Sequence, residues 1–88
     1  MARRTVDLAN KRGLHARASA KFVTLASSQA ADVLVEKDGS RVCGTSIMGL
    51  MMLGAACGDR ITISAEGDGA EEAVSALAEL VEAKFGED

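Results

Sequence analysis

The sequence has 88 residues and contains no tryptophan, tyrosine or proline, only two phenylalanines and two cysteines, and a single histidine. Without tryptophan and tyrosine, the chain lacks the side chains on which single-stranded nucleic acids usually stack, so no nucleic-acid partner is expected. Cys43 and Cys57 are too far apart for a redox or metal pair and too few for a disulfide framework. We therefore expect both cysteines to be buried as small apolar residues, and we expect no metal and no cofactor.

Long apolar runs are also missing. The longest nearly apolar segment, residues 47–57, has 11 residues, whereas a helix that spans a bilayer needs about 20. The N-terminus lacks the apolar stretch of a secretory signal, which favours a cytoplasmic protein without a membrane segment. A chain of this length has room for one small domain, residues 1–88.

Charge is distributed unevenly along the chain. The first 21 residues hold six basic side chains and one acidic side chain, a net charge of +5, while the whole chain carries −3. A basic end on an acidic protein favours a local anion site or an acidic protein partner. The alternative from charge alone is a solvated face without a ligand.

Periodicity predicts the order β-α-β-β-α-β-α. Polar and apolar residues alternate in four segments, and helical spacing marks three others. Ser46 is expected to cap the second helix, Asp68 and Glu71 to form a capping box, and Gly86 to end the last helix. The expected strands are 4–8, 32–37, 40–43 and 60–66, and the expected helices are 16–26, 47–53 and 70–85.

These elements predict an α+β fold, a two-layer open-faced sandwich with three helices on one face of a four-stranded antiparallel sheet. A helical crossover makes the first two strands parallel, and the last strand can insert between them, antiparallel to both. Asp38-Gly39 is typical of a two-residue hairpin turn between the second and third strands. The predicted strand order is 1-4-2-3.

The single histidine, His15, falls where the first strand passes into the first helix. Free amides at a helix N-terminus disfavour a positively charged ring and favour an added anion. Arg17 offers a planar fork of donors suited to phosphate oxygens. The alternatives are an ordinary loop histidine and a solvated arginine.

The sequence resembles the HPr family, the histidine-containing phosphocarriers of the phosphoenolpyruvate-dependent phosphotransferase system, over essentially its whole length. The blocks that carry the resemblance are Gly13-Leu14-His15-Ala16-Arg17, Phe22-Val23, Val35-Glu36-Lys37-Asp38-Gly39, Ser46-Ile47-Met48-Gly49-Leu50-Met51 with Leu53-Gly54, and Ile63-Ser64-Ala65-Glu66-Gly67.

The resemblance implies a carrier, not an independent enzyme. His15 Nδ1 would accept a phosphoryl group from phosphorylated enzyme I and pass it to a histidine of enzyme IIA proteins. Arg17 and the backbone amides of Ala16 and Arg17 would stabilise the phosphate. The resemblance also maps a regulatory serine, the target of HPr kinase/phosphorylase in many bacteria, onto Ser46. The protein is expected to be a monomer.

The second predicted helix is apolar on nearly every side. We expect Leu50 and Leu53 to enter the core and Ile47, Met48 and Met51 to form an adaptable patch near His15. With Ala16 and Ala20, the patch would be the partner surface. An alternative function is a non-catalytic regulatory module that docks partners through Met48 and Met51.

Three positions depart from the family pattern. Ala18 stands where a proline is usual, Arg12 replaces a small polar residue, and Thr45 replaces a residue that is frequently basic. Ala18 is compatible with a first helical turn but restrains the backbone less than proline. The branch served, sugar uptake or a regulatory nitrogen-type relay, is not encoded in these motifs.

Overall fold

The computed structural model describes residues 1–87. The strands are β1 (Ala2–Asp7), β2 (Asp32–Lys37), β3 (Ser40–Cys43) and β4 (Arg60–Glu66). The helices are α1 (Ala16–Ser27), α2 (Ile47–Met52), α3 (Ala70–Glu82) and the short 3-10 turn η1 (Lys84–Gly86). Within residues 1–87, no helix combines the length and the hydropathy that crossing a bilayer requires.

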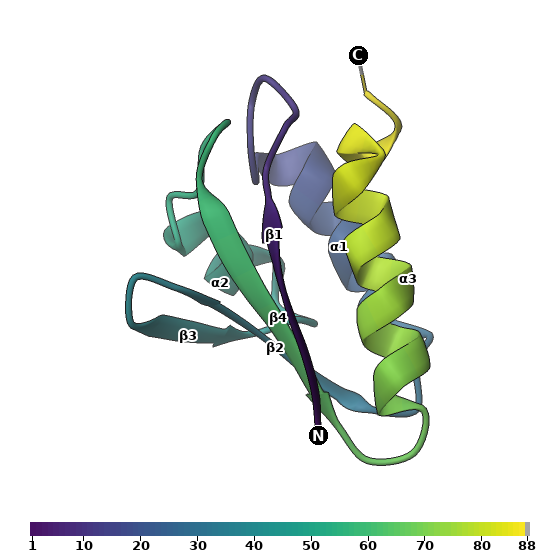
Figure 1. The fold of residues 1–88 in the computed structure, drawn as a ribbon. Helices are drawn as coiled ribbons and strands as arrows, with labels where there is room; N and C mark the ends of the chain where they lie inside the picture. The colour runs from purple at the N-terminus through teal and green to yellow at the C-terminus, as the bar shows by residue number, and fades with distance from the viewer. Residues whose placement is uncertain (88) are drawn as a thin grey trace.

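The four strands form one sheet in the order β1-β4-β2-β3, and every neighbouring pair is antiparallel. The α+β two-layer architecture, the element order and the strand order were all predicted and are confirmed. Helices α1 and α3 lie side by side against the sheet, and α2 contacts both α1 and β3 (Figure 1).

The central strand β4 carries the core of the sheet. Ile61, Ile63 and Ala65 are buried, as its alternation predicts. Ile63 faces Val35 of β2 in the register, and both are fully buried. The helices cover this face with Phe22 of α1 and Leu77 of α3, which are also fully buried, so α1 and α3 are fixed against the sheet.

Local turn chemistry explains two further elements. Asp38 and Gly39 both have positive φ, 49° and 83°, as a two-residue hairpin between twisted strands requires. Ser46 Oγ accepts a hydrogen bond from the Gly49 amide at 3.0 Å, which confirms Ser46 as the N-cap of α2.

The two cysteines are exposed, so the expectation that they are buried is wrong. Cys43 lies opposite Leu34 in the β2–β3 register, one residue beyond the pair Val35 and Val42. Side chains alternate along a strand, and since Val35 points into the core, Cys43 points to the open face. Cys57 lies in the turn before β4.

The predicted start of the last helix at residue 70 is confirmed, but its predicted capping box and its predicted end are wrong. Gly69 with φ 75° occupies the N-cap of α3, and no side chain caps the helix, so Asp68 and Glu71 form no capping box. The α-helix ends at Glu82, because the backbone turns left-handed at Lys84 and Phe85, with φ 58° and 56°. Phe85 is nevertheless buried, and segment 84–87 runs back toward the start of α1.

Candidate functional site

The loop between β1 and α1 is held against the segment before β4. Gly13 has φ 62°, and a Cβ atom there would lie 2.3 Å from the Ala55 carbonyl oxygen. The Leu14 amide donates to the same oxygen at 3.0 Å, and the Leu14 side chain is buried. Glycine is therefore required at residue 13, and the loop delivers the next residue but one, His15, to a fixed position.

His15 is the N-cap residue of α1, as its predicted location at the strand-to-helix junction requires. Its backbone is extended, and its carbonyl accepts from the Ser19 amide at 2.8 Å. Its ring nitrogen Nδ1 accepts a hydrogen bond from the Arg17 amide at 3.2 Å. Because the amide can only donate, Nδ1 carries a lone pair and no proton in this arrangement.

The other ring nitrogen contacts a residue far away in sequence. Nε2 of His15 lies 2.5 Å from Oε2 of Glu87. The second carboxylate oxygen of Glu87 accepts from Asn10 Nδ2 at 3.1 Å, and Asn10 also donates to the Gly13 carbonyl at 2.8 Å. Asn10 is fully buried, whereas the side chains of His15 and Glu87 are 20% and 21% exposed. The histidine ring is thus held at both of its nitrogens.

The electrostatics of Glu87 determine the direction of this hydrogen bond. Partial burial raises the pKa of the Glu87 carboxyl, but the hydrogen bonds from Asn10 and His15 and the positive charge of Lys21 outweigh it. The net effect lowers the pKa below its ordinary value of 4.5, so Glu87 is ionised at neutral pH. An ionised carboxylate only accepts, so Nε2 donates and the ring proton lies on Nε2.

Beside the ring is an open cavity of about 340 Å³, lined by Lys11, Arg12, His15, Arg17 and Glu87. Three of the five residues are positively charged, and a helix N-terminus lies at the same place. Such a cavity favours an anion. Arg17 is exposed, so its guanidinium is free to turn toward a bound group.

The second region singled out by the sequence is the start of α2. Ser46 is half-buried and caps the helix, while Leu50 is fully buried and Leu53 packs against the core. The predicted exposed residues are indeed on the surface: Ile47 is 41% exposed, Met48 69% and Met51 41%. Met52, which was not singled out, is 79% exposed and belongs to the same surface.

Ala16 and Ala20, the other predicted interface positions, lie on α1. Ala16 is exposed and Ala20 is half-buried, and α1 contacts α2 directly. We name the surface formed by Ile47, Met48, Met51 and Met52 the methionine patch. The histidine and this patch therefore lie on two helices that pack against each other.

Sequence reasoning missed Asn10 and Glu87. Glu87 is 72 residues from His15, and no local motif connects them. Asn10 reads as an ordinary loop residue, and its burial depends on the fold. Only the course of segment 84–87 brings the two together.

Comparisons with known proteins agree with the architecture. The family model described as "PTS HPr component phosphorylation site" matches residues 2–83. The chain is 48% identical over 87 residues to phosphocarrier protein HPr of Neisseria meningitidis, covering 99% of this chain and 98% of that protein. It is 42% identical over 82 residues to HPr-like protein Crh of Bacillus subtilis, covering 93% and 96%.

Among solved structures, HPr from Thermoanaerobacter tengcongensis superposes with a TM-score of 0.96 at 49% identity, covering 100% of this chain and 99% of that one. A match of this extent in sequence and in fold defines the family. The chain belongs to the HPr family of phosphocarriers of the phosphotransferase system.

Proposed function

We propose that His15 Nδ1 accepts a phosphoryl group from phosphorylated enzyme I and passes it to a histidine of enzyme IIA proteins. The observation that carries the proposal is the unprotonated Nδ1 at the N-terminus of α1, beside a cavity lined by Lys11, Arg12 and Arg17. Family membership supplies the phosphocarrier chemistry, and the site supplies an atom suited to it.

The step needs no general base, because Nδ1 has no proton to lose. Its lone pair attacks phosphorus, the bond from phosphorus to the donor breaks, and that electron pair returns to the donor. Charge on the equatorial oxygens is stabilised by the Arg17 guanidinium and by the Ala16 and Arg17 amides. The Arg17 amide, which now donates to Nδ1, becomes available to a phosphate oxygen as soon as Nδ1 forms its new bond.

In both transfers the reaction occurs between two proteins, so the chain acts as a carrier that is phosphorylated once per cycle. The proposed location of this carrier is the cytoplasm. Its partner surface comprises Ala16, Ala20 and the methionine patch. Methionine side chains adapt to surfaces of different shape, which suits a carrier that meets several partners in turn. The proposed partners are enzyme I and enzyme IIA proteins, and the proposed carrier is a monomer.

Ser46 is the proposed site of regulatory phosphorylation by an HPr kinase/phosphorylase. Its hydroxyl accepts a hydrogen bond at the N-terminus of α2, next to the exposed Ile47 and Met48. A phosphate there would be stabilised by the helix, so it would act by placing charge within the partner surface and not by unfolding.

The methionine patch also supports a second candidate, a regulatory module that binds partners through Met48 and Met51 while His15 stays unmodified. That surface is a feature of the described structure whichever function holds. The two functions differ in whether a phosphoryl group is ever found on His15.

The test is to incubate the protein with phosphoenolpyruvate and enzyme I and to measure its intact mass. We expect one added phosphoryl group that is labile in acid and absent in His15→Ala. Ser46→Ala serves as the matched control, because it removes the other capping side chain and should retain the adduct. An unmodified wild-type mass with an enzyme I that phosphorylates another HPr would reject the carrier and favour the binding module.

A further inference from the structure

We propose that Glu87 is a positioning residue that keeps the proton on His15 Nε2 throughout phosphoryl transfer, and that Asn10 holds Glu87 in place. The part that concerns transfer rests on the proposed function of His15. The part that concerns the ring proton does not, because it can be measured in the unphosphorylated protein.

Segment 84–87 is fixed to the protein at several points, so the contact of Glu87 with His15 is built into the fold. Lys21 of α1 donates to the Phe85 carbonyl at 2.7 Å, and the Phe85 side chain is 1% exposed. Lys84 and Phe85 adopt left-handed backbone conformations, which are unfavourable for residues with a Cβ atom. Burial of the Phe85 ring compensates for this strain, and the result aims Glu87 at the histidine.

The orientation of Asn10 follows from its neighbours. Both the Gly13 carbonyl and the Glu87 carboxylate only accept hydrogen bonds, so the amide nitrogen of Asn10 must face them. Its oxygen Oδ1 is buried and has no partner among the described residues. An aspartate at residue 10 would therefore place a carboxylate against two acceptors, one of them charged.

The chemical consequence concerns the charge of the ring. When Nδ1 bonds to phosphorus and Nε2 keeps its proton, the ring becomes positive and lies against the Glu87 carboxylate. In the onward step the bond from phosphorus to Nδ1 breaks, its electron pair returns to Nδ1, and the ring leaves as neutral imidazole. If Nε2 lost its proton first, the ring would have to leave as an anion, which is a much poorer leaving group.

The other charged side chains that line the cavity oppose a positive charge on the ring. Lys11, Arg12 and Arg17 line the same cavity, and Lys21 lies near Glu87 through its bond to segment 84–87. Glu87 is the one acidic residue among those that line the cavity. Without its charge, the phosphorylated ring would lose the nearest side chain that favours retention of the proton.

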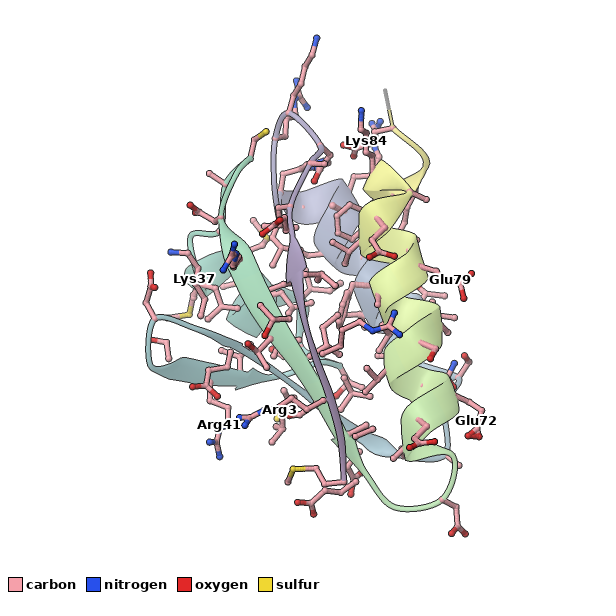
Figure 2. The ribbon with its side chains drawn as sticks, in the orientation of Figure 1. Arg3, Lys37, Arg41, Glu72, Glu79 and Lys84 are labelled. Carbon is pink, nitrogen blue, oxygen red and sulfur yellow. The ribbon has the colours of Figure 1, made fainter. Side chains whose placement is uncertain are left out.

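The first experiment observes the His15 Nε2 proton by NMR in the unphosphorylated protein. We expect a proton signal that is protected from exchange with water in the wild type and exchanges about tenfold faster in Glu87→Gln, since a neutral amide binds it less strongly. Asn10→Asp should accelerate exchange as well. Glu79→Gln is the control, because it removes the same charge from the outer face of α3 (Figure 2).

The second experiment follows loss of the phosphoryl group to water from the phosphorylated protein as a function of pH. In Glu87→Gln the fall in rate at high pH should begin about one pH unit lower than in the wild type. Glu79→Gln should leave the profile in place. Equal exchange and equal pH profiles in the wild type and Glu87→Gln would overturn the proposal.

The two proposals fail in different ways. If no phosphoryl group reaches His15, the function fails, and proton exchange in the unphosphorylated protein still decides the role of Glu87. If the adduct forms but Glu87→Gln leaves proton exchange unchanged, His15 stands as the acceptor and the positioning role is rejected. If Glu87→Gln fails to fold, Asn10→Asp provides the same readouts.

Discussion

Helices α1 and α2 begin in the same manner and differ in what surrounds their first turns. Each has an N-cap side chain that accepts a hydrogen bond from a backbone amide. His15 accepts it from the Arg17 amide, and Ser46 accepts it from the Gly49 amide. The His15 ring is hydrogen-bonded at both of its nitrogens and lies beside three basic residues. The Ser46 cap lies beside exposed apolar side chains.

The comparison shows that a helix N-terminus alone does not select a function. Both ends carry partial positive charge that would stabilise a phosphate. At α1, the loop, the cavity and the neighbouring cations suit a group that arrives and leaves repeatedly. At α2, an added phosphate would change a surface that partners are proposed to contact.

The largest difference between the caps should appear when the nearby glycines are replaced. In Gly13→Ala, the added Cβ would meet the Ala55 oxygen at 2.3 Å in a left-handed backbone, and we expect a loss of about 3 kcal/mol or more in the free energy of unfolding. In Gly49→Ala, the nearest atoms would be 3.1 Å away, and alanine favours the helix, so the change should stay within about 1 kcal/mol. Urea unfolding measures both, and equal losses would show that the two caps are supported alike.

Removal of the guanidinium should separate function from stability at the first cap. We expect Arg17→Ala to slow phosphorylation of His15 by about a hundredfold, because a donor to the transferring group is lost. The melting temperature should hardly change, since Arg17 is exposed. The phosphorylation rate of Arg17→Lys should lie between those of the wild type and Arg17→Ala, because an ammonium keeps the charge and loses the planar fork. A rate in Arg17→Ala equal to that of the wild type would remove Arg17 from the site.

At the second cap, Ser46→Ala should cost about 1 kcal/mol of stability, as the loss of a capping hydroxyl usually does. Ser46→Asp should keep the melting temperature, because a carboxylate also caps and suits the helix N-terminus. It should nevertheless slow phosphorylation of His15 by placing charge within the partner surface. Calorimetry and a transfer assay with enzyme I check both, and a clear loss of stability in Ser46→Asp would defeat this explanation.

The smallest expected effect concerns the pH dependence of the contact between Glu87 and His15. The pKa of Glu87 is lower in the folded protein than its ordinary value of 4.5. Its contribution to stability is therefore fully present above that value and is lost as the pH falls through the lower pKa of the folded state. The melting temperatures of the wild type and Glu87→Gln should differ at neutral pH and converge in acid. A difference that persists in acid would show that the carboxylate charge is not responsible.

Features that depend on neighbours in sequence could be predicted. Alternation in residues 60–66 indicated the buried side of β4, the dipeptide Asp38-Gly39 indicated the hairpin, and Ser46 indicated the start of α2. His15 was found because it is the only histidine and precedes a helical pattern.

Features that depend on distant segments could not be predicted from the sequence. The carboxylate that contacts His15 lies 72 residues away, and the exposure of Cys43 depends on which residue of β2 it opposes. The cap of α3 was misread because Gly67 and Gly69 both adopt positive φ, which a motif search based on Asp68 and Glu71 does not consider. The position of His15 at the start of a helix could therefore be predicted from the sequence, whereas the contact of its Nε2 with Glu87 could not.

The strand order has a consequence for how the protein is made. β4 lies between β1 and β2, so within residues 1–87 β1 pairs with β4 alone, and Ala2 pairs with Ala65. On a ribosome, β1 must wait for the chain to be synthesised through residue 66 before its backbone groups find their partners. Contacts with so large a sequence separation are slow to close. The strand that leads into the His15 loop is thus paired only after β4 has been made, so the surroundings of His15 are complete only late in synthesis.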